Sequence, residues 1–181
     1  PVQAIRHQVV GASAGMSHSL FVTAGGTVHT CGDGREGRLG HGDDSIHLKP
    51  APLGTLAGLV NIVAVQAGGC HSLLLSDLGE VYSFGCGLAG RLGIGNMDNM
   101  NRPALIAALE SHTVVSIAAG AAHNVVLTDA GDIFTWGNGG FGRLGHGSAC
   151  NEILPREVLL SSHTTVKAVA VAAGECHTCV F

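Results

Sequence analysis

Five residues near the start of the chain carry the pattern of a serine hydrolase nucleophile. Residues 11–15 read Gly-Ala-Ser-Ala-Gly, and hydrolases with G-x-S-x-G present the serine on a sharp strand-to-helix turn, near an acid and a histidine. The residues after Gly15 have the character of a strand. In the repeats described below, the residues that align with Ser13 are Gln66, Ala118 and Ala172. We therefore expect no hydrolase chemistry from this motif.

A second pattern, Gly-x-Gly-x-x-Gly, is the glycine signature of dinucleotide-binding loops. It occurs three times, over 32–37, 85–90 and 137–142. In nucleotide-binding folds the pattern opens a helix whose N-terminus faces the pyrophosphate. No helical pattern follows any of the three copies. We interpret them as turns that let backbone segments approach closely, and we predict no bound cofactor.

Histidines and cysteines in this chain could in principle bind a metal ion. The pattern Gly-x-x-His supplies four histidines, and Cys176 and Cys179 form a C-x-x-C pair. Metal ligands must converge on one ion, whereas these histidines stand at separated, equivalent points of a repeat. A spacing of three along a strand also directs two cysteines to opposite faces. We predict no metal site, and we expect the histidine rings to bond backbone groups near a turn.

Several markers recur with one period of 52 to 54 residues. The Gly-x-x-His pattern gives the pairs Gly15 and His18, Gly68 and His71, Gly120 and His123, and Gly174 and His177. The longer pattern G-x-G-x-x-G-R-L-G-x-G runs over 32–42, 85–95 and 137–147. A turn glycine and a proline keep the same register. Independent markers with one period indicate a repeat architecture.

Each period contains four short segments with the character of strands. In the second period they are 62–67, 71–76, 81–84 and 103–109, and in the third 114–119, 123–128, 133–136 and 155–160. The proline that begins each fourth segment fits a strand start or a sheet edge, and the 28 glycines supply turns. Four strands in ~50 residues are typical of a propeller blade. The sequence therefore predicts an all-β fold of β-propeller blades with four antiparallel strands each.

The repeated motif also resembles a known family. It reads V-x-x-x-A-A-G-x-x-H-x-x-x-L, then D-x-G-x-x-x-x-W-G-x-G-x-x-G-R-L-G-x-G, and residues 114–147 carry it most completely. This motif resembles the regulator-of-chromosome-condensation repeat. The resemblance implies a ring of typically seven blades that binds other proteins. The family also includes a guanine-nucleotide exchange factor for a small GTPase of the Ran type.

In this register the chain holds about three and a half repeats. The parts are the end of a preceding repeat (1–8), repeat 1 (9–61), repeat 2 (62–113), repeat 3 (114–165) and the first half of repeat 4 (166–181). Residues 1–5 align with the last strand of a repeat. Because so few repeats do not close a seven-bladed ring, we expect a piece of a longer protein. Its open blade edges would favour self-association.

Charge and hydropathy limit the partners. The net charge is −4 with two lysines and no basic run, whereas nucleic-acid binders need a basic surface. No uninterrupted apolar stretch approaches the ~18 residues that span a bilayer. We therefore expect neither direct nucleic-acid binding nor a membrane. Six cysteines are too sparse for a disulfide scaffold, which favours the cytoplasm or the nucleus.

The segments after the glycine-rich patterns differ between repeats, and loops on a rigid scaffold commonly carry recognition. Candidate partner-binding residues there are Asp43, Asp44, His47, Asn96, Asp98, Asn99, Asn151 and Glu152. Their acidic and amide groups suit a polar or basic partner, and plain solvated loops are the alternative. Leu39, Leu92 and Leu144 are predicted core residues. We expect the arginines before these leucines to pair locally, with a shared anion site as the alternative.

These observations predict a non-enzymatic protein-interaction scaffold within a larger regulatory protein, with another protein as its partner. The alternative is a guanine-nucleotide exchange factor for a Ran-type small GTPase. Exchange of this kind needs no covalent chemistry from the propeller.

Overall fold

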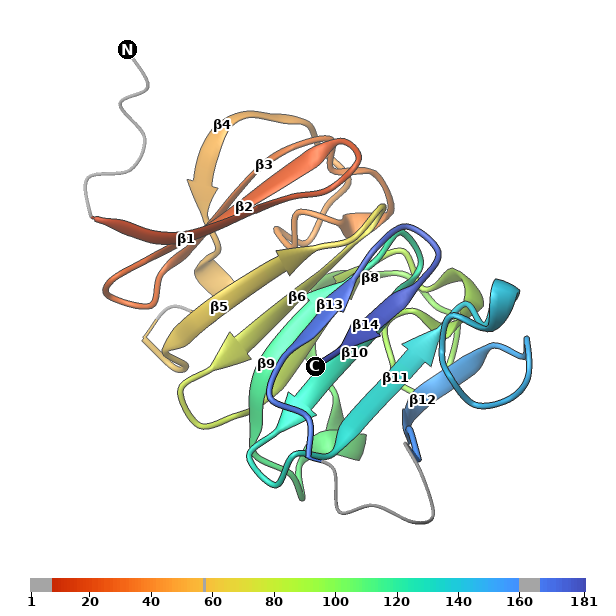
Figure 1. Cartoon of the computed structure of the whole chain (residues 1–181). Coiled ribbons are helices and arrows are strands. Elements are labelled where there is room, and N and C mark those ends of the chain that lie inside the picture. The colour runs from red at the N-terminus through yellow and green to blue at the C-terminus, as the bar shows by residue number, and fades with distance from the viewer. Residues whose placement is uncertain (1–7, 57, 160–166) are drawn as a thin grey trace.

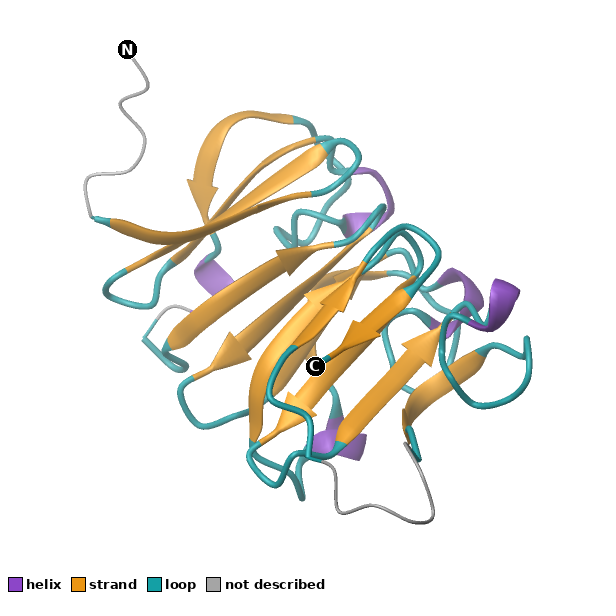
Figure 2. Ribbon diagram, viewed as in Figure 1, coloured by secondary structure: helices purple, strands orange, loops and turns teal. Residues whose placement is uncertain are grey.

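The structure is a computed structural model that describes residues 8–56, 58–159 and 167–181. Three four-stranded sheets and one two-stranded sheet follow one another along the chain (Figure 1). All strand pairs are antiparallel, and the helical elements within those ranges are single 3₁₀ turns (Figure 2). The prediction of an all-β fold built from four-stranded propeller blades is confirmed.

Each blade is formed by strands that are consecutive in the sequence. Blade 1 contains β1 (Val9–Ala14), β2 (His18–Thr23), β3 (Val28–Gly32) and β4 (His47–Pro52). Blade 2 contains β5 (Ile62–Ala67), β6 (His71–Ser76), β7 (Val81–Gly85) and β8 (Met100–Leu105). Blade 3 contains β9 (Val114–Ala119), β10 (His123–Thr128), β11 (Ile133–Gly137) and β12 (Glu152–Glu157). A half-blade contains β13 (Val171–Ala173) and β14 (Thr178–Val180).

The 3₁₀ turns stand at two recurring places. Three follow the third strand of a blade: η1 (Arg35–Gly37), η3 (Leu88–Gly90) and η5 (Gly140–Gly142). Two follow the fourth strand: η2 (Gly54–Leu56) and η4 (Ala107–Leu109). The first strands of successive blades contact one another, β1 with β5, β5 with β9 and β9 with β13. The sheets therefore fan out from a common inner side, as Figure 1 shows.

The apolar cores lie between neighbouring blades rather than inside any one of them. Leu74 on β6 packs with Phe84 and with the strands of blade 1. Leu73 and Leu75, on the other face of the same strand, pack with Trp136 of blade 3. This alternation follows from the two-residue period of a strand. Because both of its faces are covered, β6 is buried along its whole length.

The Gly-x-x-His pattern has a steric cause at this inner side. A Cβ atom on Gly68 would collide with the ring of His71 and would lie 2.8 Å from the carbonyl oxygen of Gly120 in the next blade. Gly15 and Gly120 meet the same two obstacles, their own histidine ring and the next blade's glycine carbonyl. Only glycine leaves room for both contacts.

The fourth strands lie earlier in the sequence than predicted. The expected segments were 103–109 and 155–160, whereas β8 ends at Leu105 and β12 ends at Glu157. Pro103 is the fourth residue of β8, so its placement as the first was wrong. Gly85 pairs with Met100 and Ser83 with Ala104, so Pro103 stands in a register shift, where its missing N–H costs no ladder bond. Its placement on an edge strand agrees with the structure.

Some predicted features fall outside the described residues. They are the strand expected over 1–5 and the end of repeat 3 around 160–165. No helix in the described ranges is long and apolar enough to cross a bilayer.

We expect Trp136 to be the residue whose truncation destabilises the fold most. The indole is fully buried between blades 2 and 3, and its Nε1 donates a hydrogen bond of 3.1 Å to the carbonyl oxygen of Arg91. Trp136→Ala should lower the free energy of unfolding by ~3–5 kcal/mol. Trp136→Phe keeps most of the packing and should cost only ~1–2 kcal/mol. Urea unfolding followed by circular dichroism measures both, and equal losses for the two variants would contradict this account.

Candidate functional site

The histidine of each Gly-x-x-His pattern bonds a side chain of the following blade. Nε2 of His71 lies 2.6 Å from Oδ1 of Asn124, whose Nδ2 donates to the carbonyl oxygen of Arg91 at 2.6 Å. Because a carbonyl oxygen only accepts, the amide nitrogen of Asn124 must face Arg91 and its oxygen must face the histidine. His71 therefore carries its proton on Nε2. The three groups form a bridge that leaves blade 2, enters blade 3 and returns.

The same bridge recurs at the other two blade junctions. His18 reaches Ser72 at 2.9 Å, and the Ser72 hydroxyl donates to the carbonyl oxygen of Arg38 at 2.9 Å. His123 reaches Thr178 at 3.1 Å, and Thr178 donates to the carbonyl oxygen of Arg143 at 2.7 Å. The histidines were expected to bond backbone groups near a turn. Backbone groups of His71 and His177 do interact with His18 and His123, but each of the three rings also bonds a side chain of the following blade, which was not predicted. The sequence signal for the true partner is the polar residue that directly follows each histidine.

Burial keeps these histidines neutral. Desolvation lowers the pKa of His18 to about 4, that of His71 to about 3 and that of His123 to about 4. The nearby arginine of the G-R-L-G pattern lowers each pKa further. The Nδ1 atoms of these rings are buried without a hydrogen-bond partner in the described residues. A proton added at Nδ1 would have no acceptor, so the protonated form is disfavoured. His177, in the half-blade, is exposed.

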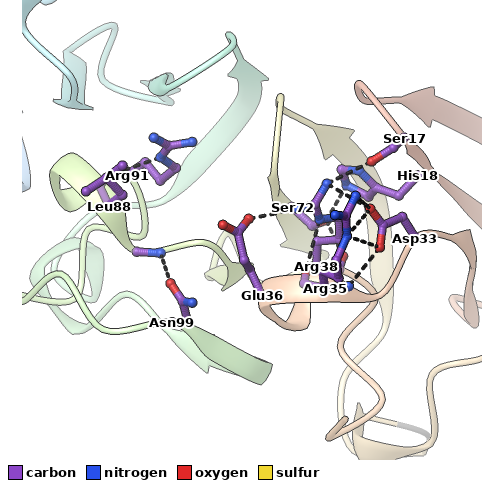
Figure 3. A network of polar contacts seen from close by, with 11 residues as sticks. Ser17, His18, Asp33, Arg35, Glu36, Arg38, Ser72, Leu88, Arg91 and Asn99 are labelled. Carbon is purple, nitrogen blue, oxygen red and sulfur yellow. Dashed lines mark hydrogen bonds and ion pairs between the residues drawn. The ribbon is translucent and has the colours of Figure 1, made fainter. Parts of the chain in front are cut away.

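The arginines of the G-R-L-G pattern are nine-tenths buried and share one backbone anchor. Nε of Arg38, Arg91 and Arg143 donates to the carbonyl oxygen three residues earlier, at 2.8 to 2.9 Å. The terminal nitrogens of Arg38 also bond the Ser17 hydroxyl at 2.7 Å and the Glu36 carboxylate at 2.8 Å (Figure 3). Local pairing therefore holds for Arg38.

The leucines that follow these arginines lie deep in the blades. Leu39, Leu92 and Leu144 are at most 1% exposed. A hydroxyl of the third strand donates to each leucine carbonyl oxygen, at 2.7 to 2.8 Å. The G-R-L-G segment is thus fixed to its blade on both sides of the arginine.

One end of the blades carries the residues that do not repeat. In an antiparallel blade the turn after the first strand and the connection after the third strand leave the sheet at the same end. We call this end the loop face. Its exposed apolar side chains include Met16, Leu88 and Phe141. Phe141 has φ +59° and is 88% exposed, so it holds an uncommon backbone conformation at the surface.

Six of the eight candidate residues lie in the connections after the third strands, and His47 and Glu152 begin the fourth strands β4 and β12; together they are spread over three blades. Five of their side chains accept hydrogen bonds within their own connection or strand. Asp43, Asn96, Asn99 and Asn151 accept backbone N–H groups, and Glu152 accepts from Arg156. The ring of His47 stacks on His41 at 4.2 Å. The carboxylates of Asp44 and Asp98 are exposed and have no hydrogen-bond partner in the described part of the chain.

The motifs that resemble hydrolase and nucleotide-binding signatures have structural roles in this fold. Ser13 lies on β1, accepts the N–H of Ala67 at 2.9 Å and is followed by another strand. The three Gly-x-Gly-x-x-Gly copies end in 3₁₀ turns of three residues, too short for a phosphate-binding helix. Within the described ranges no group of three histidine, cysteine or acidic residues could hold a metal ion. Cys176 and Cys179 are free thiols.

Antiparallel blades joined by these bridges define a β-propeller repeat protein. The family model "Regulator of chromosome condensation (RCC1) repeat" matches residues 25–75, 79–127 and 130–181. A second model with the same description matches 62–91 and 114–143. The chain belongs to the RCC1 repeat family, as its motifs predicted.

Several curated proteins are similar to this chain. Human E3 ubiquitin-protein ligase HERC2 is 40% identical over 171 residues, which are 94% of this chain and 4% of HERC2. Human probable E3 ubiquitin-protein ligase HERC4 is 36% identical, over 96% of this chain and 16% of HERC4. The ultraviolet-B receptor UVR8 of Arabidopsis thaliana is 37% identical, over 98% of this chain and 40% of UVR8. The chain therefore spans less than half the length of these relatives.

Solved structures share the fold. Yeast RCC1 (Prp20), in a crystal structure with Kap60, superposes with a TM-score of 0.79 at 23% identity, over 97% of this chain and 42% of that chain. Human WBSCR16 superposes with a TM-score of 0.59 at 26% identity, over 98% of this chain and 58% of that chain.

We expect the histidine bridges to make the stability depend on pH. An unfolded histidine takes up a proton below its ordinary pKa of 6.5, whereas the folded rings resist it down to about 4 or 3. Stability should therefore be complete above pH 6.5 and fall as the pH drops toward 4, by ~1.4 kcal/mol per pH unit for each ring. Urea unfolding at pH 7.5 and pH 5 measures this slope. His71→Gln keeps an N–H donor and cannot titrate, so its slope should be smaller. An unchanged slope would remove His71 as a cause.

Proposed function

We propose that this chain is a non-enzymatic protein-interaction module that binds a partner protein on its loop face. One observation carries the proposal. The repeated residues are buried in contacts within and between blades, whereas the connections after the third strands differ between repeats and are exposed over 43–46, 95–99 and 147–151. A rigid frame with variable, exposed loops is the usual arrangement of a recognition surface.

The exposed apolar side chains support binding of a protein. Leu88 and Phe141 occupy the 3₁₀ turns of adjacent blades and are 63% and 88% exposed. When a partner covers large apolar side chains that were in solvent, the free energy falls by ~25 cal/mol per Å² of apolar surface buried. Aromatic side chains are enriched among the residues that dominate binding energies.

The acidic side chains indicate the charge of the partner. Asp43, Asp44 and Asp98 are exposed in the connections of blades 1 and 2. A basic segment on the partner would complement them and would accelerate its association.

A guanine-nucleotide exchange activity toward a small GTPase is the alternative to a scaffold. Support for it comes from the family, since the yeast RCC1 structure shares this fold and a second structure of Prp20p is titled with its binding to Gsp1p. Exchange acts by wedging loops against a nucleotide site, so it would use the same loop face. No observation on the described residues favours exchange over binding alone, and we propose the scaffold.

We expect the acidic residues of the loop face to be needed for partner binding. The combined substitutions Asp43→Asn, Asp44→Asn and Asp98→Asn should weaken binding of a protein retained by the immobilised chain about tenfold, because they remove complementary charge. Leu78→Ser is the matched control, since Leu78 is 74% exposed on the turn at the opposite end of blade 2. Quantitative mass spectrometry of the retained proteins and titration of the main one provide the measurement.

One result would overturn the loop face as the interface, and another would overturn the scaffold. Equal binding by the acidic variant and the wild type, with loss in Leu78→Ser, would move the interface to the other end of the blades. Catalytic acceleration of fluorescent GDP release from a Ran-type GTPase by substoichiometric chain would establish exchange instead.

A further inference from the structure

Arg91 differs from its two equivalents in one respect. All three arginines keep the Nε bond to a backbone carbonyl oxygen, and in Arg91 this acceptor is Leu88, at 2.8 Å. Among the described residues, the terminal nitrogens of Arg91 have no hydrogen-bond or ion-pair partner; Figure 3 shows the Nε bond to Leu88. The whole residue is only 9% exposed. A nearly buried cation without a counter-charge is costly in a folded protein.

The repeat shows which partners are missing. Ser17, Asp33 and Glu36 surround the terminal nitrogens of Arg38, with the Asp33 carboxylate at 3.7 Å. The residues at the equivalent positions of blade 2 are Cys70, Cys86 and Ala89. In blade 3, Arg143 donates to the backbone carbonyl of Glu175 at 3.3 Å and lies 5.7 Å from the ring centre of Phe141. Blade 2 has therefore kept the arginine and lost both acids.

The unpaired terminal nitrogens of Arg91 are accessible from the loop face. None of the nitrogens of Arg91 is among the fully buried unpartnered atoms, so its terminal nitrogens reach the surface. Nε of the same guanidinium bonds the backbone carbonyl of Leu88, whose side chain is the exposed apolar residue of the turn. A partner bound to Leu88 would therefore also cover this guanidinium.

We propose that Arg91 is the binding site for a carboxylate from an acidic side chain of the partner protein. The proposal rests on the proposed function, because it places one contact on the loop face. The guanidinium fork matches the two oxygens of a carboxylate in a bidentate pair. The partner's carboxylate takes the place that the Glu36 carboxylate occupies beside Arg38.

The surroundings favour a carboxylate over a phosphate group. A phosphate carries more charge and needs several donors. One backbone donor beside the turn, the N–H of Gly87, is already bonded to Oδ1 of Asn99 at 2.9 Å. His71, which lies close enough for Arg91 to lower its pKa, is neutral and adds no second positive charge.

Restoring the missing acid within the chain tests the site. Ala89 has φ +62° and Glu36 has φ +61°, so Ala89→Glu places a carboxylate on the same backbone conformation. This variant should fill the site of Arg91 with an internal carboxylate. Arg91→Met removes the charge but retains the apolar stem, and provides a second, independent way to abolish binding.

The probe is N-acetyl-aspartate amide, with N-acetyl-asparagine amide as the neutral control, at constant ionic strength. NMR of the arginine Nε–Hε groups in the ¹⁵N-labelled chain reads each site separately. We expect a saturable shift of the Arg91 signal and none at Arg38, which has its own acids. Ala89→Glu should weaken binding at this site at least about tenfold. Arg91→Met lacks the reporting Nε–Hε group, so it is followed through the backbone amide signals of residues 87–90, which the probe should shift in the wild type and not in this variant. No saturable shift at Arg91, or equal shifts at Arg38, would overturn the proposal. Tighter binding of inorganic phosphate would overturn the carboxylate assignment.

The two proposals fail separately. If Arg91 binds the aspartate probe but Ala89→Glu leaves partner binding intact, the carboxylate site exists and the partner does not use it, which overturns the proposal as stated. If Ala89→Glu weakens partner binding while the Asp43, Asp44 and Asp98 substitutions do not, the carboxylate contact is supported and the basic complement of the proposed function fails.

Discussion

The contact between neighbouring blades is the constraint on which the rest of this structure depends. No blade has a core of its own, because Leu74 of β6 is covered by blade 1 and Leu73 is covered by blade 3. The polar part of the same junction is the bridge from His71 through Asn124 to the carbonyl of Arg91. Breaking one member would leave buried polar groups unpaired, which costs more than the bond itself contributes. Burial keeps the rings neutral, so the junction is held by hydrogen bonds and packing rather than by charge.

This constraint divides the residues of each repeat into two kinds. Glycine at Gly68 is required because the histidine ring and the next blade's backbone occupy the space of a side chain. Glu36, Ala89 and Phe141, in contrast, share one backbone conformation and differ completely in chemistry. The backbone of this turn is thus the same in all three blades, while the side chain at this position changes from the buried Ala89 to the exposed Phe141.

The sequence was sufficient for the architecture because period, turns and apolar runs all have local causes. The start of β8 was predicted wrongly because Pro103 was taken as the first residue of the strand. In the structure the strand begins at Met100, and its pairing with β7 has a register shift between Ser83 and Gly85. The bridge of His71 was missed because its partner, Asn124, is 53 residues away. Of the candidate residues, Asn96 accepts the backbone N–H of Asp98, two residues further on. An asparagine that closes a turn in this way is a familiar local pattern, so that role could have been predicted.

Repetition also limits where function can arise. The recurring histidines are held neutral by burial, and their Nε2 atoms are already bonded between blades. Specific chemistry must then come from departures from the repeat. The turn around Arg91 is such a departure. Its Nε bond to Leu88 explains why the arginine is retained in blade 2. That bond leaves its terminal nitrogens without the acids that Arg38 has. The fold therefore explains why an arginine is present at this position. An anion from another molecule would explain why its terminal nitrogens have no acidic partner within the described chain.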